Sequence, residues 1–148
     1  MASKLYKNIL IATDGSEYTK NSIDYGIELA KNTQAKLHII YVIDTAAFAS
    51  IPMDAAWESM YELLKQEGDE ATRYAADKAE AEGIVTERNT MEGHPAEEII
   101  KYAEKNSMNL IVMGTLGKSG LDRFLLGSVA EKVVRASKIP VLIVRGKK

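Results

Sequence analysis

Five short apolar runs alternate along the chain with longer segments of helical periodicity, and this alternation limits the fold to a few α/β architectures. The run at residues 36–43 is apolar almost throughout, as is typical of a strand covered on both faces of a parallel sheet. The other runs lie at residues 7–13, 84–91, 109–113 and 140–144. In a chain of 148 residues, the pattern predicts a single three-layer α/β/α domain with a five-stranded parallel sheet and helices on both faces.

Helical segments are expected at residues 18–31, 54–82, from 95 onward and at 128–137. Gly68 lies inside the longest of them and is expected to mark a bend or a break, whereas Gly83 is expected to end it. The expected buried stripe of this helix consists of Trp57, Met60, Leu64, Ala71, Tyr74 and Ala75. Residues 44–52 form a small-residue loop that is long enough to move, and the weakly apolar run at 84–91 predicts a sheet edge.

The composition of the chain argues against several classes of function. The net charge is −2, which argues against a nucleic-acid surface. The chain contains no cysteine, which removes disulfides, thiol catalysis and thiolate metal sites and fits the cytoplasm, where we expect the protein. No apolar run approaches the ~18 residues of a membrane span, so no membrane association is expected. Of the two histidines, His38 is expected to be a satisfied core residue and His94 to belong to a helix start.

The segment 109–128 carries the strongest functional signal. Its apolar strand stops at Gly114, Gly117 follows, and nine residues later come Gly127 and Ser128. Ser128 and Glu131 have the spacing of a capping box, which predicts a helix N-terminus there. A strand, a glycine loop and a helix N-terminus in this order present free backbone N–H groups to an anion. We therefore expect the loop to hold the phosphates of a nucleotide, with Lys118 and Arg123 either reaching them or remaining solvated.

Two better-known phosphate motifs are excluded. A P-loop would need its first glycine at position 112, which is Val112, and no Gly-x-Gly-x-x-Gly follows the first strand. Instead, Asp14 and Gly114 each follow the carboxyl end of a strand. If these strands are neighbours across the point where the strand order reverses, the two loops face each other over one ligand crevice.

The spacing Gly114-x-x-Gly117, nine residues, Gly127-Ser128 resembles the signature of ATP-binding universal stress proteins. The likeness extends to the segments 12–16, 41–42, 93–96 and 140–144, and so covers nearly the whole chain. This resemblance implies a Rossmann-like sheet of order 3-2-1-4-5, bound ATP with Mg²⁺ or Mn²⁺, and a homodimer paired through the C-terminal strand Val141, Leu142, Ile143 and Val144. Such pairing would also cover an apolar sheet edge.

The resemblance also assigns roles to individual residues. Ala12, Thr13 and Asp14 would border the nucleoside, the Val42 backbone would contact adenine, and Met113 and Gly114 would line the ribose side. The remaining contacts, mainly to the phosphates, would come from Leu116, Gly117, Gly127, Ser128 and Val129. Asp14 and Ser128 could also serve only as a turn residue and a helix cap.

No catalytic set is evident in the sequence. The favoured interpretation is an ATP-binding regulatory protein of the stress response, with slow or no turnover and an unknown protein partner. The alternatives are a slow ATPase or self-phosphorylating phosphotransferase, and a nucleotide-free dimeric docking module.

Overall fold

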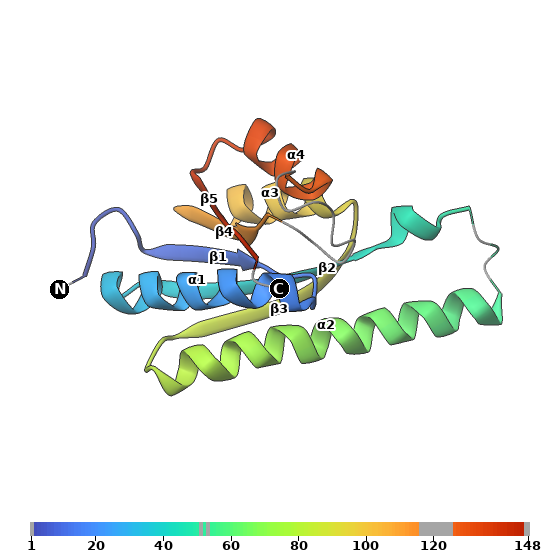
Figure 1. Ribbon diagram of the computed structural model, residues 1–148, viewed down its shortest axis with the longest axis horizontal. Coiled ribbons are helices and arrows are strands. Elements are labelled where there is room, and N and C mark those ends of the chain that lie inside the picture. The colour runs from blue at the N-terminus through green and yellow to red at the C-terminus, as the bar shows by residue number, and fades with distance from the viewer. Residues whose placement is uncertain (1, 51, 53, 116–125, 147–148) are drawn as a thin grey trace.

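A computed structural model describes residues 2–50, 52, 54–115 and 126–146 of the chain (Figure 1). Five parallel strands form one sheet in the order β3-β2-β1-β4-β5. The strands are β1 (Asn8–Ala12), β2 (Lys36–Asp44), β3 (Thr86–Gly93), β4 (Leu110–Gly114) and β5 (Val141–Val144). The predicted fold class and strand order are confirmed, and β3 lies at a sheet edge as expected.

Helices cover both faces of the sheet. The elements are η1 (Glu17–Thr19), α1 (Lys20–Thr33), η2 (Thr45–Phe48), α2 (Ala55–Ala81), α3 (Pro95–Lys105) and α4 (Ser128–Ala136). One core lies between the sheet, α1 and the C-terminal half of α2, and a second lies between the sheet, α3 and α4 (Figure 1). None of the described helices is long and apolar enough to cross a bilayer.

Strand β1 shows why the central runs are apolar throughout. Ile9 and Ile11 point into the core under α1, while Leu10 and Ala12 point into the core under α3 and α4. The side chains of Ile9, Leu10 and Ile11 are completely buried, because helices cover both faces. Successive side chains point to opposite faces of the sheet, and both faces are buried, so residues 9–12 of the strand are all apolar.

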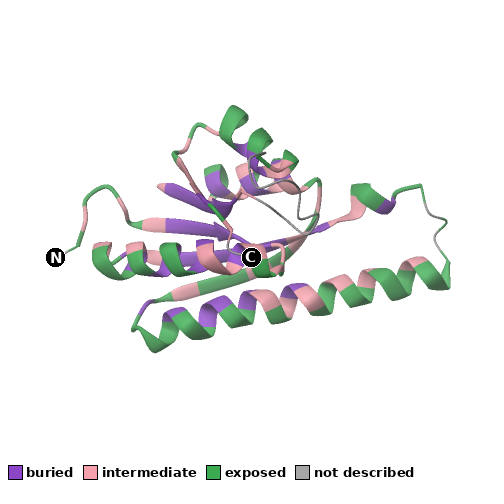
Figure 2. Ribbon diagram, in the orientation of Figure 1, coloured by how far each residue is buried: buried purple, intermediate pink, exposed green. Residues whose placement is uncertain are grey.

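The long helix α2 departs from two expectations. It runs unbroken through Gly68, so the predicted bend or break is wrong. The expected buried stripe is confirmed only in part: Ala75 is fully buried and Trp57, Leu64 and Ala71 are partly buried, whereas Met60 and Tyr74 are 40% and 39% exposed. The N-terminal half of α2 extends past the sheet, so only a small cluster around Phe48 lies beneath it (Figures 1 and 2). The buried residues are Gly68, Thr72, Ala75, Ala76 and Ala79.

The two ends of α2 are well defined. Asp54 caps the first turn, because its Oδ1 accepts hydrogen bonds from the backbone N–H groups of Ala56 and Trp57. At the other end Gly83 has a φ of +80°, and its N–H donates to the Glu80 carbonyl. The predicted end at Gly83 is confirmed, since a positive φ of this kind favours glycine.

The segment after β2 is more ordered than the sequence suggests. Residues 45–48 form the short helix η2, whose first turn is capped by Asp44 Oδ1 accepting from the N–H of Ala47. Phe48 is only 4% exposed and packs with Tyr41 and Ile43 of β2. Residues 45–48 are therefore a short helix and not part of the expected loop, and a buried aromatic side chain anchors them.

His38 fulfils its expectation only in part. It is 5% exposed, and its Nδ1 lies 2.8 Å from the hydroxyl oxygen of Tyr102 on α3. Its Nε2 is buried without a hydrogen-bond partner among the described residues. Burial lowers the pKa of His38, because the charged form would lose solvation there.

Candidate functional site

A cavity of about 570 Å³ opens at the carboxyl ends of β1, β2 and β4. This is the edge where the strand order reverses, since β1 continues into α1 on one face and its neighbour β4 is reached from α3 on the other. Loops after three strands and the first turn of α4 contribute its walls. The lining residues from these elements include Ala12, Thr13, Asp14, Val42, Asp44, Met113, Gly114, Thr115, Gly127, Ser128, Val129 and Ala130.

The turn after β1 is held by its own polar side chains. Thr13 is buried, and its Oγ1 lies 3.0 Å from Thr19 Oγ1 and accepts a hydrogen bond from the N–H of Gly15. Its backbone N–H donates to the Ile40 carbonyl of β2. Gly15 itself has a φ of +80°, a conformation that favours glycine. These bonds fix the turn firmly against the sheet.

Asp14 acts as a turn residue and also lines the cavity. Its Oδ1 accepts from the backbone N–H of Ser16 at 3.0 Å and from the Ser16 hydroxyl at 2.6 Å. Both bonds fall on the same oxygen, so Oδ2 has no protein partner in the described part of the chain. Asp14 can therefore hold the turn and offer an acceptor to a ligand at the same time.

Gly114 and Gly127 are brought together across the site. The N–H of Gly127 donates to the Thr115 carbonyl at 2.8 Å, and the N–H of Thr115 donates to the Val144 carbonyl at 3.0 Å. The start of α4 is thereby tied to the end of β4 and, through it, to β5. The end of β4 and the start of α4, which the sequence predicts on either side of a glycine loop, thus lie together at the cavity.

The N-terminus of α4 points its free donors at this cavity. Gly127 is the N-cap, with φ −60° and ψ 154°, and its carbonyl accepts from the N–H of Glu131. Ser128 is therefore the first helical residue, and the predicted capping box is wrong: no side chain caps this end, and Glu131 pairs with Arg135 at 2.6 Å. Among the described residues, neither the first-turn N–H groups nor the Ser128 hydroxyl has a hydrogen-bond partner, so they are available to an anion.

The structure places nine of the predicted site residues around this one cavity. They are Ala12, Thr13, Asp14, Val42, Met113, Gly114, Gly127, Ser128 and Val129. Leu116 and Gly117, together with Lys118 and Arg123, lie outside the described residues. Within the described ranges, no three His, Asp or Glu side chains are grouped as ligands for a metal ion.

Sequence reasoning missed one wall of the cavity. Ala47 and Phe48 of η2 and Met60 and Leu64 of α2 also line it. Asp44 was missed as well, although it is the last residue of β2 and so lies at the carboxyl end of a strand, as Asp14 does. That shared position was a usable signal for Asp44, whereas nothing in the sequence locates the wall from α2.

The sheet order and the cavity at the switch point define the class: this is a doubly wound α/β protein with a ligand site at the carboxyl ends of its strands. Comparison with known sequences gives the family. Residues 5–145 match the universal stress protein family. The chain is 45% identical over 141 residues to a universal stress protein of Methanocaldococcus jannaschii, covering 95% of this chain and 83% of that relative. The chain therefore belongs to the universal stress protein family.

Solved structures agree with this assignment. The structure of the hypothetical protein MJ0577 superimposes with a TM-score of 0.80 at 30% identity, covering 97% of this chain and 99% of that one. A universal stress protein in complex with cAMP superimposes with a TM-score of 0.70 at 29% identity, covering 96% and 98% of the two chains.

Proposed function

We propose that this protein binds ATP at the cavity and acts as a nucleotide-dependent regulatory protein with slow or no turnover. The observation that carries the proposal is the hydrogen bond from Gly127 N–H to the Thr115 carbonyl. It holds the uncapped first turn of α4 beside the end of β4, where backbone donors and the helix dipole favour phosphate. The similar universal stress protein in complex with cAMP supports an adenine nucleotide as the ligand class.

The cavity has chemically distinct ends that fit the two parts of a nucleotide. Ile40, Val42 and Met113 offer apolar surface to a base, while Ser128 and Val129 offer N–H groups to phosphates beside Gly127, whose own N–H is bonded to Thr115. A divalent cation, Mg²⁺ or Mn²⁺, would accompany the phosphates and offset their charge near the Asp14 carboxylate.

The residues that line the cavity favour slow turnover of ATP over efficient hydrolysis. Among the described lining residues there is no Lys, Arg or His to stabilise charge on a transferring phosphoryl group. One carboxylate oxygen of Asp14 already accepts two hydrogen bonds within the turn. A slow ATPase or self-phosphorylating activity remains the second candidate, with Lys118 and Arg123 as the nearest basic residues in sequence.

The expected homodimer is proposed to form through β5. Both outer strands are sheet edges, but β3 carries Glu87, Arg88 and Glu92, whereas β5 is Val-Leu-Ile-Val and contains no charge. Charged side chains protect an edge from pairing, and an apolar edge needs a cover. A twin β5 strand supplies that cover in a two-fold dimer.

Calorimetric titration with ATP and Mg²⁺ tests the binding site directly. We expect Gly127→Val to abolish measurable binding without unfolding the protein, because valine tolerates the backbone angles of residue 127 but adds bulk beside the phosphate position. Ser137→Val, at the other end of α4 and in a similar backbone conformation, is the control and should bind normally. Unchanged affinity in Gly127→Val would contradict the proposed site. Steady-state phosphate release by the same proteins separates a regulatory binder from an ATPase.

A further inference from the structure

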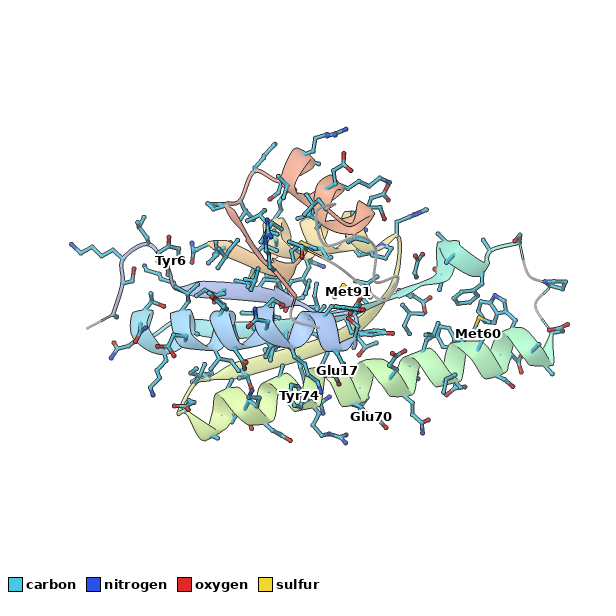
Figure 3. The ribbon with its side chains drawn as sticks, in the orientation of Figure 1. Tyr6, Glu17, Met60, Glu70, Tyr74 and Met91 are labelled. Atoms are coloured by element: carbon cyan, nitrogen blue, oxygen red, sulfur yellow. The ribbon has the colours of Figure 1, made fainter. Side chains whose placement is uncertain are left out.

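One wall of the cavity comes from a projecting part of the molecule, which we call the arm: η2 (Thr45–Phe48) and residues 55–67 of α2. The arm extends beyond the sheet (Figure 1). Phe48, Met60 and Leu64 line the cavity from this side. Figure 3 shows Met60 on the side of α2 that faces η2. A ligand in the cavity would therefore contact both the sheet and the arm.

The arm has a small aromatic core of its own. The ring centroids of Phe48 and Trp57 lie 5.4 Å apart, and Trp57 stacks on Tyr61 at 5.5 Å with an interplanar angle of 5°. The Tyr61 hydroxyl donates to Glu92 Oε2 at 2.5 Å, near the end of β3. Phe48, buried at 4% exposure, thus connects the cavity to a continuous set of arm contacts.

The arm is the weakly packed end of α2. No residue of α2 before Gly68 is fully buried, whereas Thr72, Ala75, Ala76 and Ala79 beyond it are. Figure 2 shows the same gradient along the helix. Segments with few buried contacts open at lower free energy than the core they adjoin. Detaching the arm therefore costs less than unfolding the rest of the domain, and a ligand can shift that equilibrium appreciably.

We propose that nucleotide occupancy of the cavity controls the docking of the arm, so that the arm is the element through which this protein signals its bound state. The inference rests on the proposed function. Contacts from the ligand to Phe48, Met60 and Leu64 exist only when the arm is docked, so binding favours the docked state and docking raises affinity. The outer side of the arm carries Leu63, which is 65% exposed and does not line the cavity.

Hydrogen exchange with and without ATP and Mg²⁺ tests this coupling. We expect backbone amides at residues 57–66 to exchange up to about 100-fold more slowly at a ligand concentration of 100 Kd, if only the docked state binds. Amides in the middle of α1 open only with the core and exchange far more slowly without ligand, so the arm amides are the ones that report docking. Trp57 is the only tryptophan, so quenching of its fluorescence by acrylamide should decrease on the same titration.

Two variants sharpen the test. Phe48→Ala should remove most of the ligand-dependent protection at residues 57–66, because it breaks the link between cavity and arm. Leu63→Ala, on the exposed side of the arm and away from the nucleotide cavity, should leave that protection unchanged. Binding seen by calorimetry without any change in arm exchange or Trp57 quenching would overturn the inference and leave the proposed function intact. A protein that binds no adenine nucleotide would overturn both.

Discussion

Gly68 of α2 lies directly against the ring of Tyr41 on β2. A Cβ atom at residue 68 would stand 2.6 Å from Cδ1 of that ring and 3.0 Å from Cγ2 of Thr90. Tyr41 is 2% exposed, and its hydroxyl donates to Glu67, so the ring cannot easily move aside. The glycine allows the helix to approach the sheet at the place where the arm begins.

Gly68→Ala is therefore expected to destabilise the protein. Helix propensity alone favours alanine by about 1 kcal/mol, but forcing an extra methyl group into a packed contact costs about 1–3 kcal/mol. The packing cost should win, and the free energy of unfolding measured with denaturant should fall. Gln66→Ala, at an exposed position of the same helix, is the control and should change stability little. A stabilised Gly68→Ala variant would show that the contact relaxes freely.

The lowered pKa of the buried His38 predicts that the free energy of unfolding depends on pH. Its pKa in the folded protein is lowered, mainly by burial, while in the unfolded chain it is close to 6.5. The unfolded state therefore binds more protons as the pH falls below 6.5, and the free energy of unfolding should decrease there by at most about 1.4 kcal/mol per pH unit from this group. A neutral ring that donates from Nδ1 to Tyr102 leaves only a bare Nε2 lone pair in the core, whereas protonation would bury an unpaired N–H.

Denaturant titrations between pH 7 and pH 5 measure this effect. His38→Phe, which keeps a ring in the core, should flatten the slope. If the pH dependence of stability persists in His38→Phe, groups other than His38 cause it.

Replacing Ser128 distinguishes a role in helix capping from a role in ligand binding. It makes no side-chain cap bond and is exposed, so Ser128→Ala should change the unfolding free energy by less than about 0.5 kcal/mol. If its hydroxyl binds phosphate, loss of that bond should weaken ATP binding by roughly tenfold. Asp54→Ala, which removes a true cap, should instead cost about 1 kcal/mol of stability. A stability loss in Ser128→Ala without loss of affinity would reverse the assignment.

The two sheet edges offer a matched test of the dimer. Val141 on β5 and Met91 on β3 are both half-buried apolar residues packed on the same core. Val141→Lys should yield a monomer by light scattering, because it places a charge in the proposed interface. Met91→Lys should leave the dimer intact. If the wild-type protein is monomeric, or if Val141→Lys still forms a dimer, β5 is not the interface.

The sequence predicts the strands well because burial on both faces makes them continuous apolar runs. The strand order follows from the family resemblance, and the structure confirms it. The errors have physical causes that the sequence does not carry. The pattern of α2 shows an apolar face but not where the sheet beneath it ends, so Met60 was assigned to a core. Gly68 shows only the lack of a side chain, whereas its role depends on Tyr41 across the interface.

The site was predictable where strand ends and helix starts define it, as at Asp14 and Gly127. The helix start at Ser128 was predicted correctly but its cap was not, because the spacing of Ser128 and Glu131 fits a capping box while the chain uses Gly127 as the N-cap. The wall from the arm could not be predicted, since it depends on how far β2 and α2 extend beyond their neighbours.

The most direct test of the central claim is to denature the freshly purified protein and identify the released small molecules by chromatography and mass spectrometry. The account predicts recovery of an adenine nucleotide, chiefly ATP, in an amount approaching one per chain, and far less from Gly127→Val. An empty wild-type protein that also fails to bind added ATP with Mg²⁺ would contradict the claim and favour a nucleotide-free docking module.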